Sequence, residues 1–406
     1  MITIISRVYL PLALGYALSY FYRNANAIIE QDLVAELSLT ASSLGLLTSM
    51  YFISFAACQI PVGMWLDRYG PRKTEAGLLL FAAVGAVIFS QAHSLAGLMV
   101  GRLLIGVGVS ACLMAAFKAY TLWFSKDQLP TINGFQMMAG GLGALAATAP
   151  LQSALDVTNW RTVFVGLAVI SVAISALLFF AYPKTKAPNQ SESPESIGAL
   201  WEGIVHILQS RAFWTIAPIC MFSQATFMAV QGLWIRPWLR DVIGMSAEKS
   251  ANTLFAMTLA MIAGFLLLGM LSTQLRKRFA LSTVTFSITM MTVFMAIQAV
   301  IISGYPNATL PLMLGFSFFA TSGILPYAAL SQQFDNRLAG RVNTLLNLTV
   351  FVCAFAFQWG MGMLIDLWHT TDSGGHSLIS YQTAFGCAFV LQAIGLGWWF
   401  KNRRFV

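Results

Sequence analysis

Three cationic side chains lie inside apolar stretches of this 406-residue sequence, namely Arg23, Arg102 and Lys118. A charge at the centre of a lipid-embedded helix costs about 2.5 to 3.5 kcal/mol on insertion scales, so it normally faces a partner or a water-filled cavity. A guanidinium binds a carboxylate or phosphate through two parallel hydrogen bonds, which strengthen where water is scarce. The pattern therefore favours anion binding by Arg23, with a structural hydrogen-bonding role as the alternative. For Arg102 it favours the structural role, with anion binding as the alternative. The Lys118 amine is expected to reach back to the nearer membrane boundary.

Acidic side chains avoid the middle of the apolar stretches. All fifteen Asp and Glu residues, and all four His residues, fall in loops or at the ends of these stretches. Glu30 and Asp32, at the end of the first stretch, are the candidates for proton coupling, and the alternative is a solvated pair in a loop. A region rich in cations and poor in acids favours a solute that carries a negative charge.

The composition is that of an integral membrane protein. Hydrophobic residues make up 58% of the chain, charged residues 9%, and the mean hydropathy is +0.73, whereas soluble domains carry roughly 25% charged residues. A helical span needs about 20 apolar residues. We expect twelve spans, at residues 8–29, 44–66, 75–92, 95–124, 131–154, 162–182, 213–235, 250–274, 280–303, 309–333, 342–366 and 381–400.

The distribution of Lys and Arg predicts the orientation. Sixteen of them fall in one set of predicted loops and four, Arg161, Arg236, Arg240 and Lys249, in the opposite set. By the positive-inside rule both termini are cytoplasmic. The same rule accounts for most of the net charge of +8, so we expect a lipid bilayer around the chain and no nucleic-acid partner.

The sequence carries no enzyme signature. There is no phosphate-binding Gly-x-x-x-x-Gly-Lys loop, no His-Glu-x-x-His and no Gly-x-Ser-x-Gly. The five cysteines have no metal-binding or redox spacing. We therefore expect no catalytic residue, metal or cofactor. The first apolar stretch contains Arg23 and lacks a clear cleavage site, so it is expected to remain as the first span.

A polar segment divides the chain into two similar halves. Residues 183–195 read PKTKAPNQSESPE, a composition that cannot form a packed core. A shift of 206 residues places Leu33 on Leu239, and a shift of 210 places Asn133 on Asn343. We expect an N-terminal half at 1–182, a cytoplasmic linker at 183–211 and a C-terminal half at 212–406. Within the linker, helical spacing of apolar residues predicts a short amphipathic helix on the membrane surface or an extension of span seven.

The charged segment between the second and third predicted spans contains a recognisable motif. Residues 63–73 read GMWLDRYGPRK, and the glycines with Pro71 predict a tight reversal there. Gly63, Asp67, Arg68, Gly70 and Arg72 resemble the loop motif of the major facilitator superfamily of secondary transporters. Further marks of that family are Arg102 to Gly108 in span four and Trp160-Arg161 before span six. The Gly-Pro pair of its antiporters is missing from span five.

The resemblance implies a fold, a mechanism and site residues. The fold is an all-α membrane protein with twelve transmembrane helices in two pseudo-symmetric six-helix bundles. Two bundles that rock about a central site would move a small solute by alternating access. Gly63, Asp67, Arg68, Gly70 and Arg72 would form a cytoplasmic latch, or in the simpler alternative a basic loop that only sets topology. We expect the protein to act as a monomer in the inner membrane.

Spans one, four, seven and ten line the cavity in this superfamily. An arginine at the depth of Arg23 resembles the anion-binding arginine of organophosphate and related carriers. Arg236 is either a gate or substrate contact or a boundary residue. The full set of candidate substrate-binding residues is Arg23, Tyr22, Tyr51, Arg102, Gln136, Gln231, Trp234, Arg236, Tyr327 and Asn347. The predicted substrate carries a carboxylate and is an organic anion, amino acid, peptide or siderophore; the alternative is a proton-coupled multidrug exporter.

Overall fold

The computed structural model describes residues 5–125, 128–183, 197–279, 281–305, 309–335, 338–371 and 375–405. The chain divides into two compact units, Met1–Asn189 (unit 1) and Gln190–Val406 (unit 2). Residues 184–196 of the predicted linker lie outside the described residues. The domain boundaries at residues 182 and 211 therefore remain predictions.

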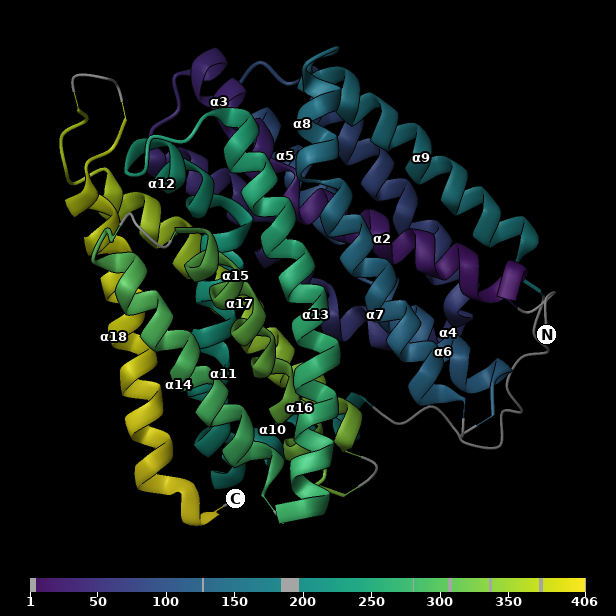
Figure 1. Cartoon of the computed structure of the whole chain (residues 1–406). Coiled ribbons are helices and arrows are strands. Elements are labelled where there is room, and N and C mark those ends of the chain that lie inside the picture. The colour runs from purple at the N-terminus through teal and green to yellow at the C-terminus, as the bar shows by residue number, and fades with distance from the viewer. Residues whose placement is uncertain are drawn as a thin grey trace. The chain divides into compact units, whose positions relative to one another are not determined.

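Unit 1 is a bundle of helices in which α4 packs against α5 and α9, and α2 packs against α7 (Figure 1). Three of its helices begin at side-chain caps: Thr40, Ser94 and Asn159 accept from the backbone amides of Ser43, Gly97 and Thr162. The elements in order are η1 (Ile5–Tyr9), α2 (Leu10–Asn24), α3 (Asn26–Leu37), α4 (Ala41–Gln91), α5 (Leu95–Val109), α6 (Cys112–Trp123), α7 (Leu129–Ala146), α8 (Ala149–Leu155) and α9 (Trp160–Ala181).

Unit 2 repeats this plan with different interruptions. Its α11 packs against α17 and α18, and α13 packs against α15. The elements are α10 (Ile197–Gln209), α11 (Arg211–Ala229), η2 (Val230–Trp234), α12 (Ile235–Asp241), α13 (Ala247–Phe279), α14 (Thr283–Ile302), α15 (Thr309–Ala320), η3 (Thr321–Ile324), α16 (Leu325–Ser331), α17 (Ala339–Ile365), α18 (Leu378–Asn402) and η4 (Arg403–Phe405).

The helices account for the predicted spans. Within the described residues, nine helical stretches are long and apolar enough to cross a membrane. One of them, α4, contains both the second and the third predicted span. The first and fifth predicted spans correspond to the broken pairs α2–α3 and α7–α8, each divided by one or two residues. The chain thus has the twelve-helix, two-bundle fold that the sequence predicts.

The predicted reversal between spans two and three is shorter than the motif. Helix α4 runs through residues 63–73, and Gly70 alone leaves the helical conformation, at φ 74° and ψ 168°. Glycine adopts this left-handed φ without a Cβ clash. Pro71 then occupies the start of the following helix, where its missing amide donor is not needed. The expected loop at residues 67–74 is therefore too long, whereas the tight reversal is present, because one glycine suffices to join the two helices.

The predicted amphipathic segment forms α10. Ser210, with ψ 129°, separates it from α11, so α10 is a helix of its own and not an extension of span seven. Gly203 of α10 lies against Arg341 of α17: a Cβ at this glycine would sit 2.4 Å from Nη1 of the arginine. Trp201 on α10 is 63% exposed, as expected for a side chain that meets a membrane surface.

Candidate functional site

Aromatic rings surround the Arg23 guanidinium in unit 1. Its Cζ lies 4.5 Å from the ring centroid of Tyr20 on α2, and 5.7 Å from those of Tyr51 and Phe55 on α4. An aromatic face attracts a cation by about 0.5 to 2 kcal/mol, more where water is excluded. The rings therefore hold the head group in place without neutralising its charge.

Arg102 approaches the same tyrosine from α5. It is fully buried, its Cζ lies 5.3 Å from the Tyr51 centroid, and its Nη1 donates to the carbonyl of Tyr22 at 2.7 Å. Its Nε has no hydrogen-bond partner, and no ion pair joins Arg102 to an acid among the described residues. Tyr51 is thus the ring that two predicted site arginines share.

Three other candidates of unit 1 hold helices together. The Tyr22 hydroxyl lies 3.0 Å from Ser171 Oγ on α9, and the Tyr51 hydroxyl lies 3.2 Å from Ser19 Oγ. Gln136 of α7 accepts from the hydroxyl of Tyr120 at 2.7 Å and donates to the Leu12 carbonyl at 3.2 Å. These side chains are buried. Their hydrogen bonds support the two arginines by fixing α2 against α4, α6, α7 and α9.

Three of the unit 2 candidates, Gln231, Trp234 and Arg236, are also buried and hydrogen-bonded. Gln231 accepts from Ser317 Oγ at 2.7 Å, and Trp234 donates to the Gln358 carbonyl at 3.0 Å. Arg236 is 3% exposed, with its Nε 3.5 Å from the Ser250 hydroxyl. The amide of Gln358 is fully buried, and within the described part of the chain neither its nitrogen nor its oxygen has a hydrogen-bond partner. Gln358 was not among the predicted site residues, although a polar residue in an apolar run is the same signal that selected Gln136 and Gln231.

The helix of the tenth span is interrupted. Residues Thr321–Ile324 form the 3₁₀ turn η3 between α15 and α16. Gln224 of α11 donates to the Ala320 carbonyl at 2.8 Å, and a Cβ at Gly323 would lie 1.9 Å from its Nε2. The glycine therefore makes room for an amide that takes over a backbone acceptor at the break. Two further candidates follow the break in the sequence, Tyr327 on α16 and Asn347 on α17. Both side chains are half-buried.

The latch residues make their described contacts within unit 1. Asp67 on α4 forms an ion pair with Lys118 on α6, which places the Lys118 amine where the sequence predicted it to reach. Arg72 donates its Nε to the Phe179 carbonyl at 2.8 Å and lies over the Phe179 ring. Arg68 lies 5.4 Å from the Tyr69 ring centroid, and Gly63 has open space around it. The motif thus joins α4 to α6 and α9, and its role as a latch remains a prediction.

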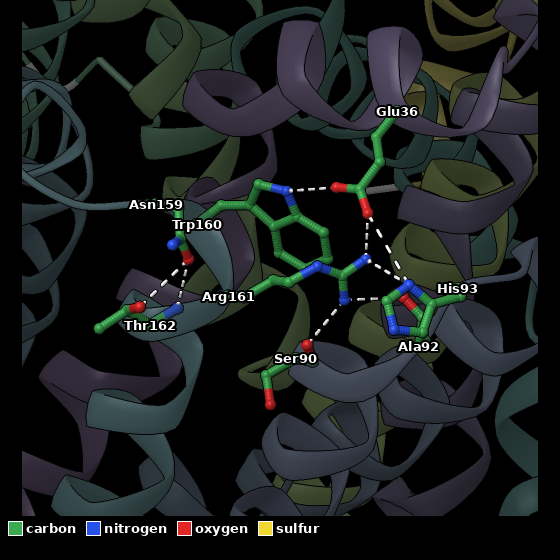
Figure 2. A network of polar contacts seen from close by, with 8 residues as sticks. All are labelled: Glu36, Ser90, Ala92, His93, Asn159, Trp160, Arg161 and Thr162. Carbon is green, nitrogen blue, oxygen red and sulfur yellow. Dashed lines mark hydrogen bonds and ion pairs between the residues drawn. The ribbon is translucent and has the colours of Figure 1, made fainter.

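A network at the opposite end of unit 1 joins α3, the α4–α5 connection and α9 (Figure 2). Glu36 pairs with Arg161 and accepts from the indole of Trp160 at 3.2 Å. Arg161 also donates to the carbonyls of Ser90 and Ala92 at 2.7 and 2.8 Å. The Arg161 hydrogen bond, helped by that of Trp160, lowers the pKa of the Glu36 carboxyl. The network accounts for the Trp-Arg pair that the sequence singled out.

Unit 2 carries a corresponding carboxylate in Asp241, at the end of α12. It accepts from the Arg240 Nε at 2.6 Å, from the His376 amide at 3.0 Å and from the Tyr381 hydroxyl at 2.7 Å. Tyr381 belongs to the first turn of α18. Burial lowers the pKa of the His376 imidazole, against the opposite effect of Asp241. In each unit a carboxylate therefore links the end of the first span to the start of the last helix.

Two acidic residues that the sequence places at span ends are buried in the structure. Asp32 is exposed and Glu30 is 2% exposed, both on α3. Glu75, placed by the sequence at a span end, is fully buried in α4. Burial of this residue could not be read from a linear pattern, because it depends on α2 and α6 packing against α4.

Comparison with known proteins identifies the family. The profile of the Major Facilitator Superfamily matches residues 12–358. The hexuronate transporter of Bacillus subtilis is 24% identical over 406 residues, which cover 95% of this chain and 94% of the relative. A probable sulfoacetate transporter of Cupriavidus necator is 23% identical over 66% of this chain, and the match spans 64% of that relative's length, less than two thirds.

A solved structure agrees with the fold. The bacterial homologue of the human lysosomal transporter Spinster, inward-facing and unoccupied, aligns with a TM-score of 0.77 at 18% identity, covering 98% of this chain and 96% of that one. The helical bundles, the loop motif and the profile define a multi-pass membrane transporter and not an enzyme. The chain belongs to the Major Facilitator Superfamily.

Proposed function

We propose that this protein is a secondary transporter that moves a small carboxylate-bearing organic anion across the inner membrane by alternating access, with both termini in the cytoplasm. The observation that carries the proposal is the pair of guanidinium groups around Tyr51, at 5.7 Å for Arg23 and 5.3 Å for Arg102. In unit 2, the candidate substrate-binding residues in this proposal are Gln231, Trp234, Arg236, Tyr327 and Asn347. The protein acts as a monomer in this proposal.

The charge of Arg102 supports an anionic solute. A buried cation without an opposite charge is unfavourable by several kcal/mol, and an incoming anion relieves that cost. Since Arg102 has no ion pair among the described residues and a free Nε donor, it can accept a carboxylate without first breaking a salt bridge. A cationic solute would add to the charge already present.

The relatives support the same chemistry. Two of them are named as a hexuronate transporter and a probable sulfoacetate transporter, and both of these solutes are small organic acids. A carboxylate is what these substrates share with each other and with the amino-acid and peptide alternatives that the sequence left open. We propose organic acids of the kind that these relatives are named for, in preference to amino acids and peptides.

The test is uptake of labelled organic acids by vesicles containing the purified protein, with a hexuronate and sulfoacetate as the first probes. Arg23→Lys and Arg102→Lys keep the charge but remove the two-pronged donor geometry. We expect each to raise the apparent KM by about tenfold or more, because losing a charge-assisted bond of about 1.4 kcal/mol or more has that effect.

Arg276→Lys is the matched control, since Arg276 is exposed at the end of α13. It should leave uptake unchanged. Uptake that is indifferent to both Arg23→Lys and Arg102→Lys, or that is restricted to cationic drugs, would contradict the proposal and favour the multidrug exporter.

A further inference from the structure

Glu75 is a buried acid that the proposed anion site does not use. It lies in α4, five residues after the Gly70 kink, and it is fully inaccessible to solvent. Neither of its carboxyl oxygens has a hydrogen-bond partner among the described residues. Its position inside the unit 1 bundle distinguishes it from Glu36 and Asp67, which pair with Arg161 and Lys118.

Helix α2 packs directly against this carboxyl group. A Cβ built on Gly15 would lie 2.3 Å from Glu75 Oε1 and 3.8 Å from the Cys112 sulfur. Glycine at position 15 thus leaves the space that the carboxyl group fills, and the Cys112 thiol of α6 lies beside it. The carboxyl group is enclosed by α2, α4 and α6, with no room for a shell of water while these helices stay packed.

The groups facing Glu75 do not compensate a negative charge. From α6 these are the Cys112 thiol and the Tyr120 phenol, and the Tyr120 hydroxyl donates to Gln136. From the end of α9 it is the phenol of Tyr182, which accepts from Trp123. On α6 and α4, Lys118 pairs with Asp67 and Arg72 donates to the Phe179 carbonyl. On α2 the contact is Gly15, which has no side chain.

An ionised carboxylate in such surroundings is strongly disfavoured, whereas the protonated acid is tolerated. We propose that Glu75 is a proton-binding site that is occupied in this conformation and emptied when α2 separates from α4 and α6. On release, the O–H bond of the acid breaks, the proton passes to water, and the carboxylate that remains is solvated by the water that enters.

A proton site would serve the proposed transport of an anion, and this consequence rests on the proposed function. Moving one negative charge into a cell interior at negative potential costs about 2.3 kcal/mol per 100 mV. A proton carried in the same cycle cancels that charge and adds the driving force of a pH gradient. Glu75 would bind this proton away from the arginines, so the solute and the proton would not compete for one group.

The first experiment needs no solute. The infrared spectrum of the purified protein in lipid should contain a carbonyl band of a protonated carboxylic acid. Glu75→Gln should remove this band, and Glu75→Asp should shift it. Glu248→Gln, at an exposed glutamate of α13, is the matched control and should leave the band in place. A spectrum in which Glu75→Gln removes no such band overturns the proposal.

The second experiment separates coupling from binding in vesicles. Glu75→Gln should abolish accumulation driven by a pH gradient but keep exchange of labelled for unlabelled solute, since the amide resembles the protonated acid. Accumulation that equals that of the wild type, or loss of accumulation and exchange together, overturns the coupling role. If none of the organic acids is transported, the proposed function fails, and the infrared band alone then decides whether Glu75 holds a proton.

Discussion

At the scale of single residues, Tyr51 has two separable tasks. Its ring lies near both guanidinium groups, while its hydroxyl bonds to Ser19 on α2. Aromatic side chains often combine an apolar body with one hydrogen-bonding group in this way. The two tasks can therefore be tested by two substitutions at one position.

Tyr51→Phe should leave the apparent KM for the transported acid within about twofold, since the ring that the cations contact is kept. Tyr51→Leu should raise it several-fold, because each cation loses an attraction of about 0.5 to 2 kcal/mol. Initial rates of uptake measure both. Equal effects of the two substitutions would show that the hydroxyl, and not the ring, supports the arginines.

The residue scale also shows what sequence could and could not predict about the site. Arg23 and Arg102 are identifiable because charge is rare in an apolar stretch, and both lie near Tyr51. Gln136 fits the same rule, yet its amide oxygen and nitrogen bond to protein groups, the Tyr120 hydroxyl and the Leu12 carbonyl. Polarity in a span thus signals that a partner exists, but only the packing of other helices decides whether the partner is solute or protein.

At the scale of elements, glycines determine how closely helices approach. A Cβ at Gly108 on α5 would lie 2.2 Å from the backbone nitrogen of Ala82 on α4, and one at Gly143 on α7 would lie 1.9 Å from the Ala17 carbonyl of α2. Backbone atoms cannot swing away as a side chain does. These glycines are therefore packing residues, which also explains the glycine run of span five without an antiporter role.

Gly108→Ala should destabilise the protein by about 1 to 3 kcal/mol, the usual cost of adding a methyl group to a filled interface. The control is Gly77→Ala on α4, where nothing lies within 4 Å of the added Cβ. The thermal unfolding temperature in detergent measures both, and it should fall for Gly108→Ala alone. An equal unfolding temperature for the two variants would mean that the α4–α5 interface accommodates the added methyl group without cost.

The Glu36–Arg161 contact predicts a pH dependence of stability. Because the pKa of Glu36 is lowered in the folded protein, chiefly by Arg161, its contribution is complete above the ordinary carboxyl pKa and is lost as the pH falls through the lowered value. Wild type should therefore unfold at a higher temperature than Glu36→Gln near neutral pH. The difference should shrink toward zero in acid, and a difference that is constant with pH would contradict this account.

Element boundaries were predictable only where the chain is interrupted by polar residues. The twelve apolar stretches gave the right number of helices and the right two-bundle fold. The α4 kink was mispredicted, since a charged segment predicts a loop whereas Gly70 with Pro71 needs one non-helical residue. The clustering of glycines at α4–α5 and α2–α7 depends on contacts between helices, which a single sequence does not contain.

At the scale of the whole molecule, the charge bias predicts which ends of the units face the cytoplasm. Val157, 87% exposed before α9, should lie outside, and exposed Arg276 at the end of α13 should lie inside. In a cysteine-free background, a membrane-impermeant maleimide added to intact cells should label Val157→Cys and leave Arg276→Cys unlabelled. Labelling of Arg276→Cys alone would show that the orientation is the reverse of the predicted one.

The carboxylates Glu36 and Asp241 have a consequence for how each half can deform. Each connects the end of the first span to the start of the last helix of its unit. Glu36 does so through Trp160 and Arg161. Asp241 does so through Tyr381. A ring of helices closed in this way resists splaying at that rim. Strain during the transport cycle should therefore concentrate at the opposite rim, where the Gly70 hinge and the Gly15–Glu75 contact lie, and amide hydrogen exchange there should be the first to respond to solute.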